Sequence, residues 1–281
     1  MAEFINKGLY NFLEFSFEQL PPSGNLLKDM QEDKLDGVVI SGIFDANELK
    51  AFQSQFQKFS EQIKGSDLYA ETDFGSVIGS SLMENNLKAY LDRACRSLNF
   101  FESVFQGNFC SLVTGVLSKL TGGQRVFQAR FPDTDKSTSP ASVRICKPEH
   151  KALNAHIHRE FGLYFPLYQK IAAISRLETE LSYYLMLQKP SSGGALTLYD
   201  LQWHNTPKEY IRPEVFMAEQ RNNFLDNLDQ MHISLSEGEM IIFAANRIWH
   251  KINAVQGDTN RITIGGFITE SLDSRYQYYW I

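Results

Sequence analysis

Short runs of β-branched and aromatic residues, separated by turns, fill the chain beyond Gly122-Gly123 and constrain its fold more than any other feature. Strands of this length and spacing are typical of a β-sandwich, barrel or jelly roll. The pattern therefore predicts an antiparallel β core in the C-terminal half. The strands expected there span residues 125–131, 142–147, 152–158, 180–188, 195–203, 239–243, 248–255 and 261–269.

The N-terminal half carries mostly helical signals, after one expected strand at residues 36–44. Asp45 and Glu48 have the spacing of a capping box, which begins a helix. Apolar side chains then recur at three- and four-residue steps, so one face of this helix should pack on the core. Further helices are expected over residues 86–105 and onward to about residue 120.

These signals predict a single domain over residues 1–281, in which helices of about residues 1–122 support a β core of about residues 123–281. The polar segment 206–229 interrupts the strands, and we expect a helical insertion there, close to the substrate entrance. At this length roughly three quarters of the unfolded surface is buried on folding, so stability needs no structural metal. A metal bound by this chain would therefore serve another purpose.

Composition excludes several classes of function. The chain has 27 Lys and Arg against 33 Asp and Glu, a net charge of -6, and no basic stripe suited to nucleic acid. No apolar run approaches the ~20 residues of a membrane span, and the first residues lack the features of a signal peptide. Three widely spaced cysteines fit a reducing compartment. We therefore expect a cytoplasmic protein that acts on a small molecule, with no nucleic-acid or membrane partner, and the oligomeric state stays open.

A candidate metal site begins in the strand expected at residues 152–158. His156, His158 and Glu160 stand at alternate positions, so their side chains could leave the same face of a strand. A His-x-carboxylate pair supplies two corners of the facial triad that non-haem iron(II) favours, and a distant histidine completes it. His250 is the candidate for that third ligand.

An arginine and a threonine follow His250 at the start of the last expected strand, as Arg261-Ile262-Thr263. A guanidinium can hold a carboxylate through two parallel hydrogen bonds, and the threonine adds a hydroxyl donor. This pair could anchor the far end of a dicarboxylate whose near end chelates the metal. The combination is what an iron(II)/2-oxoglutarate oxygenase requires, so Fe(II), 2-oxoglutarate and O2 are the expected cofactors.

Several segments carry a family resemblance that covers about residues 35–281 and is dense in the last hundred. They comprise residues 181–184, 193–196, Tyr199, Leu201, Trp203, residues 238–243, 249–251, 260–267 and 278–280. They are similar to iron(II)/2-oxoglutarate oxygenases, and within them to the carrier-independent halogenases and hydroxylases of indole-isonitrile alkaloids. The resemblance implies a mainly β fold with N-terminal helices around a double-stranded β-helix, the cupin-like jelly roll. It also implies that His250 is the distal iron ligand and Arg261 the 2-oxoglutarate anchor.

The first ligand pair departs from the halogenase pattern. Halogenases of this group resemble His-x-Gly there, and the missing carboxylate opens a position for chloride. This chain has neither Gly nor Ala two places after His156 or His158. If His158 is the first ligand, Glu160 is the carboxylate of an ordinary triad; if His156 is the first ligand, His158 completes a three-histidine site. We favour the first arrangement, because an anionic ligand lowers the charge of the iron centre.

The predicted function is therefore iron(II)- and 2-oxoglutarate-dependent oxidation of an aliphatic C–H bond, by hydroxylation, in a free metabolite of natural-product or amino-acid type. A cupin-type dioxygenase with three histidine ligands, which needs no 2-oxoglutarate, is one alternative. A halogenase and a non-catalytic jelly-roll binding protein are the others.

Other residues receive smaller expectations. His204 is a secondary candidate for substrate contact, whereas His150 and His232 are expected in surface turns. Arg144 faces inward or outward depending on the strand register, so a carboxylate-binding role stays open. Gly265-Gly266, inside a strand, predicts close backbone packing rather than a phosphate cradle.

Overall fold

The computed structural model describes residues 3–6, 8–20, 24–81, 84–132, 134–211 and 219–281. Within these ranges eleven strands form one large sheet. Its main path runs β1 (Glu3–Asn6), β2 (Asn11–Ser16), β3 (Gly37–Ser41), β12 (Met240–Phe243), β8 (Ser175–Gln188), β15 (Arg261–Ser271), β7 (Ser142–Cys146), β5 (Gly75–Ile78) and β4 (Tyr69–Thr72). Beside β15, β16 (Tyr276–Trp280) continues to β6 (Arg125–Gln128).

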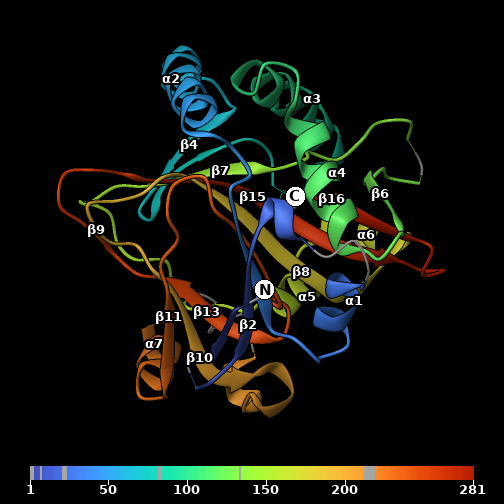
Figure 1. Ribbon diagram of the computed structural model, residues 1–281, viewed down its shortest axis with the longest axis vertical. Coiled ribbons are helices and arrows are strands. Elements are labelled where there is room, and N and C mark those ends of the chain that lie inside the picture. Colours follow the sequence, from blue (N-terminus) through green and yellow to red (C-terminus); the bar gives the residue numbers. More distant parts are fainter. Residues whose placement is uncertain (1–2, 7, 21–23, 82–83, 133, 212–218) are drawn as a thin grey trace.

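A small sheet faces the large one. Its strands are β11 (Gln230–Ile233), β10 (Leu196–Gln202) and β13 (Ile248–Ile252), and β9 (Ser192–Gly193) pairs with β14 (Val255–Gln256) nearby. Figure 1 shows β10, β11 and β13 on the side of the molecule opposite to α2 and α3. Two facing sheets with this mainly β composition form the jelly-roll core that the sequence predicts.

Helices cover the other side of the large sheet (Figure 1). The N-terminal half provides α1 (Leu26–Gln31), α2 (Ala46–Ile63), α3 (Leu87–Val104) and α4 (Phe109–Leu120). Three shorter helices follow, α5 (Phe161–Tyr164), α6 (Pro166–Ile171) and α7 (Glu219–Asp226), and α7 lies beside the small sheet rather than on the helix side (Figure 1). The capping box of α2 is confirmed, because Asp45 accepts from the Glu48 amide and Glu48 accepts from the Asp45 amide.

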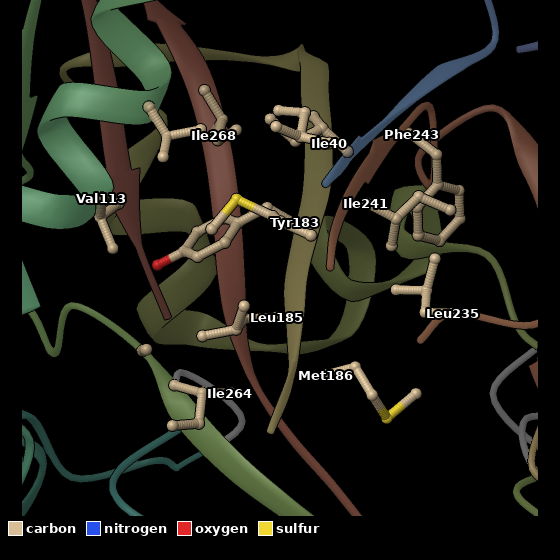
Figure 2. Close-up of a cluster of buried hydrophobic side chains, with 14 of the residues drawn as sticks. Ile40, Val113, Tyr183, Leu185, Met186, Leu235, Ile241, Phe243, Ile264 and Ile268 are labelled. Atoms are coloured by element: carbon tan, nitrogen blue, oxygen red, sulfur yellow. The ribbon is translucent and has the colours of Figure 1, made fainter. Parts of the chain in front are cut away.

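The side chains of β15 divide between the two faces of the large sheet, because successive residues of a strand point in opposite directions. Ile264 and Ile268 belong to the helix-side core with Val113 of α4 and with Tyr183 and Leu185 of β8 (Figure 2). The opposite face of β15 therefore carries Arg261, Thr263, Gly265 and Phe267 toward the small sheet.

Glycines in β15 allow the neighbouring strands to approach closely. A Cβ atom at Gly265 would lie 2.2 Å from the Tyr183 carbonyl oxygen, and one at Gly266 would lie 2.6 Å from that of Trp280. Both distances are shorter than a van der Waals contact. The predicted role of Gly265-Gly266 in backbone packing is thus confirmed.

The prediction of a strand at residues 152–158 is wrong. His156 makes only an isolated bridge to His250, and a 3-10 helix begins at His158. Side chains of α7 form hydrogen bonds with the backbone of this segment instead. Asn222 accepts from the Ala155 amide, and Arg221 donates to the Ala155 carbonyl. A backbone whose polar groups are satisfied in this way needs no neighbouring strand.

Other expectations have mixed outcomes. The core is not purely antiparallel, since β2 pairs with β3 and β16 with β6 in parallel. The expected insertion contains α7, and residues 212–218 of it lie outside the described part of the chain. No helix among the described residues has the length and apolarity to cross a membrane. The single-domain boundaries stay a prediction.

Candidate metal centre

Three histidines from two distant stretches of chain converge between the sheets. His156, His158 and His250 each offer a ring nitrogen, and these three atoms lie within 4.8 Å of one another. Two backbone hydrogen bonds of 2.9 and 3.0 Å join His156 to His250, and the His158 amide donates to Ala245 at 3.0 Å. The bridge aligns two of the imidazoles, and the third comes from the turn that follows it.

The Nδ1 atom of each imidazole already has a partner. That of His156 lies 2.9 Å from the Asn154 carbonyl oxygen, and that of His250 lies 2.9 Å from the Ile248 carbonyl oxygen. Nδ1 of His158 lies 2.9 Å from Oε1 of Glu180. A carbonyl accepts only from a protonated Nδ1, which leaves Nε2 with a free lone pair. The histidines are therefore oriented to present Nε2 to a common point.

Burial keeps these imidazoles neutral. Desolvation is the main cause that lowers the pKa of His158 and of His250 to about 3. Desolvation also lowers the pKa of His156 well below its usual value, and the neighbouring His250 and His158 lower it further. A neutral imidazole is the form that binds a metal.

Glu160 lies in the 3-10 helix and pairs with Arg221 of α7 rather than joining the three histidines. Both carboxylate oxygens lie 3.0 Å from Nη1 of Arg221, and both side chains are fully buried. Burial raises the pKa of Glu160 to about 7, while the arginine lowers it. The expectation of a shared strand face with His156 and His158 fails here, because residues two apart in a helical turn point in different directions.

Glu180 is a second carboxylate beside the histidines, and the sequence analysis missed it. Its Oε1 contacts His158, and its Oε2 accepts from the Tyr168 hydroxyl. Burial raises the pKa of Glu180 to about 8, and the tyrosine lowers it. Its sequence signal was weak, because the same strand also contains Arg176, Glu178 and other polar residues.

Arg261 and Thr263 lie side by side on the site face of β15. Nη1 of Arg261 donates to the Thr263 hydroxyl at 3.3 Å, and the guanidinium lies 5.1 Å from the ring centre of Tyr184. Nε of Arg261 is buried without a hydrogen-bond partner. A guanidinium that is 2% exposed and has an unused N–H is suited to a carboxylate.

Arg144 faces the site as well. Residue pairing across β7 and β15 sets Arg144 opposite Thr263 and Cys146 opposite Arg261, so all four side chains share one face. This settles the register that the sequence left open.

Phenylalanine rings surround the imidazoles. The ring centres of Phe161 and Phe267 each lie 4.9 Å from that of His158, and Phe243 lies 5.1 Å from His250. Rings packed this closely exclude water from the back of the site.

Residues 9–281 match the family model of the carrier-protein-independent halogenase WelO5. The chain belongs to the WelO5 family. The match spans nearly the whole sequence and includes the three histidines, Arg261 and Thr263. As a member of this family the chain is an iron(II)- and 2-oxoglutarate-dependent oxygenase, with O2 as the oxidant.

Solved structures share the fold of this chain. An N-substituted L-amino acid dioxygenase from Burkholderia ambifaria superimposes with a TM-score of 0.58 at 14% identity, over 99% of this chain and 97% of that one. The same enzyme in complex with 2-oxoglutarate has a TM-score of 0.54 at 14% identity, over 90% of each chain. A comparison with curated proteins gave no match.

The donor set of this WelO5-family member fits both cofactors. Three neutral imidazoles with free Nε2 atoms suit Fe(II), and the unused N–H of Arg261 suits the carboxylate of 2-oxoglutarate. The WelO5-like chain differs from the His-x-Gly pattern in having His158 two places after His156.

The remaining histidines lie apart from the three imidazoles of the WelO5-like site. His204 is exposed and lines a surface pocket with Trp203, Arg159 and Asn246. His150 lies in a turn, as expected, whereas His232 lies in β11 and hydrogen-bonds to Thr197, so its expected turn is wrong. A substrate contact by His204 stays a prediction.

Proposed function

We propose that the protein hydroxylates an aliphatic C–H bond of a free small molecule. In this proposal His156, His158 and His250 hold Fe(II), and Arg261 with Thr263 holds the distal carboxylate of 2-oxoglutarate. His156 thus takes the place that the sequence analysis assigned to Glu160.

The observation that carries the proposal is that His158 belongs to the imidazole group. In the His-x-Gly pattern this position has no ligand, and chloride occupies the vacant place. These three histidines would hold Fe(II), and 2-oxoglutarate and O2 would use the donor positions that the histidines leave. With His158 bound, no position remains for chloride, which favours hydroxylation over halogenation.

Residues of the chain itself orient the histidine ligands and exclude water from the site. The Asn154 and Ile248 carbonyls and Glu180 fix the three rings through Nδ1. When bound, iron and 2-oxoglutarate supply the O2-dependent oxidation of the C–H bond, with release of succinate and CO2. The phenylalanine rings limit access of water to that chemistry.

A direct test compares wild type with His158→Gly and Glu160→Gln under Fe(II), 2-oxoglutarate, O2 and chloride. Candidate metabolites are screened by succinate release, and products are identified by mass. We expect a hydroxylated product from wild type and from Glu160→Gln. His158→Gly should lose that product or replace part of it with a chlorinated one. Chlorination by wild type would contradict the proposal.

A three-histidine dioxygenase that does not use 2-oxoglutarate, one alternative from the sequence, would have the same three imidazoles, but membership of the WelO5 family argues against it. Arg261 and Thr263 favour the hydroxylase, since a dioxygenase of that kind has no need of a dicarboxylate anchor. Oxygen consumption with substrate separates the two: it requires 2-oxoglutarate only in the hydroxylase.

A further inference from the structure

A second arginine lies next to the proposed cosubstrate anchor. Arg144 is the cross-strand partner of Thr263, whose hydroxyl contacts Arg261. Directly opposed residues of an antiparallel pair have Cβ atoms roughly 5 Å apart. Arg144 and Thr263 therefore begin from neighbouring points on the site face, and the longer side chain reaches further across it.

The surroundings of Arg144 place it near both the anchor and the imidazoles. Its positive charge is among the causes that lower the pKa of His158 and of His156. The charge of Arg261 in turn lowers the pKa of Arg144, after the larger effect of desolvation. One guanidinium is thus close to the two halves of the site.

No acidic side chain among the described residues neutralises Arg144. No ion pair or hydrogen bond joins it to another side chain in that part of the protein. The two carboxylates nearest the histidines are already engaged, Glu160 with Arg221 and Glu180 with His158 and Tyr168. The guanidinium of Arg144 is therefore available to bind an anion at the site face.

Accessibility separates Arg144 from Arg261. Arg261 is 2% exposed, whereas more than a third of Arg144 is accessible to solvent although surrounding protein desolvates it. Solvent therefore reaches Arg144, while Arg261 lies beneath. A group that arrives from solution after the cosubstrate would meet Arg144.

The charge balance of the site with Fe(II) and 2-oxoglutarate bound also indicates that Arg144 lacks an anionic partner. Because the three histidines are neutral, only the two carboxylates of 2-oxoglutarate would balance the charge of Fe(II). Of these carboxylates, one has Arg261 and Thr263 as partners and the other has the metal. The charge of Arg144 is then left without an anion.

We propose that Arg144 binds an anionic group of the substrate, a carboxylate, so that the substrate is an organic acid. This inference rests on the proposed function and names the substrate class of the same site. The planar guanidinium would hold the carboxylate through two hydrogen bonds and thereby fix which C–H bond faces the metal.

The test measures binding rather than turnover. Matched acid and amide pairs serve as probes: N-acetyl-L-leucine with its amide, indole-3-acetate with indole-3-acetamide, and octanoate with octanamide. Their binding to the anaerobic protein loaded with Fe(II) and 2-oxoglutarate is followed by calorimetry. The variants are Arg144→Gln, Arg144→Lys and Arg261→Gln, and Arg275→Gln, a change at an exposed arginine, is the matched control.

In wild type and the control, at least one acid should bind about tenfold more tightly than its amide. Arg144→Gln should lose that preference, and Arg144→Lys should retain part of it and show that the fold tolerates the site. Both Arg144 variants should bind 2-oxoglutarate within about twofold of wild type, unlike Arg261→Gln.

Two results would overturn the proposal. One is a wild-type protein that prefers no acid over its amide. The other is an Arg144→Gln variant that loses 2-oxoglutarate as severely as Arg261→Gln, since Arg144 would then be a second cosubstrate contact. Failure of the proposed function itself looks different, because wild type would then bind no 2-oxoglutarate or would chlorinate its substrate in the turnover test.

Discussion

Nδ1 of His158 lies 2.9 Å from Oε1 of Glu180, and both side chains are buried. With a metal on Nε2 of His158, Nδ1 would keep its proton and donate a hydrogen bond to this carboxylate. Such a contact fixes the orientation of the ring and raises its basicity. Without a metal, burial raises the pKa of Glu180 to about 8, and a cation on Nε2 of His158 would favour the charged form of this carboxyl.

We predict that Glu180→Gln lowers the affinity for Fe(II) by about 10- to 100-fold, because the His158 ring loses its charged acceptor. Anaerobic calorimetry with Fe(II) measures the loss. Glu178→Gln, two residues away and exposed, is the matched control and should bind as wild type does. Equal affinities in the two variants would show that Glu180 has no influence on the metal.

His156→Ala and Glu160→Gln distinguish the two ligand sets. His156→Ala should abolish tight iron binding, whereas Glu160→Gln should retain it. Glu160→Gln should instead lower the free energy of unfolding by about 3 kcal/mol, because the buried Arg221 loses its counter-ion. Metal titration and urea denaturation report the two effects. If Glu160→Gln lost iron binding and His156→Ala did not, Glu160 rather than His156 would be the metal ligand.

Arg261→Ala should weaken 2-oxoglutarate binding by about 100-fold, since a charge-assisted pair of hydrogen bonds is lost. Fe(II) affinity should stay near that of wild type, because the imidazoles do not contact this residue. Thr263→Val removes one hydroxyl and should have a smaller effect, about fivefold. If Arg261→Ala still bound 2-oxoglutarate normally, Arg261 would not be its anchor.

The metal-free protein should lose stability in acid. The pKa of His250 is about 3 in the folded protein and about 6.5 when unfolded. Between these values the unfolded chain binds the extra proton, so this contribution to stability is complete above pH 6.5 and falls as the pH drops toward 3. Relative to His250→Gln, wild type should lose about 2 kcal/mol between pH 6.5 and pH 5. Urea denaturation at both values measures this, and parallel losses in the two proteins would contradict the lowered pKa.

Much of the fold could be predicted from local patterns. The capping box at Asp45, the apolar helix periodicity and the short strands are set by residues close together in sequence, so their signals survive without the tertiary structure. Strand β16 was missed because its aromatic run, Tyr276–Trp280, gives no clear alternation of polar and apolar residues.

A His-x-Glu pair with His156 beside it, followed by His250 and then by Arg261 and Thr263, was enough to predict an iron and 2-oxoglutarate site, because each cofactor requires particular donor groups. Which donors meet was decided only by the tertiary structure. Glu160 turns away because the chain coils after His158 and because Arg221, 61 residues later, offers it a buried charge. Long-range pairing likewise set Arg144 on the site face, and no local pattern encodes such a register.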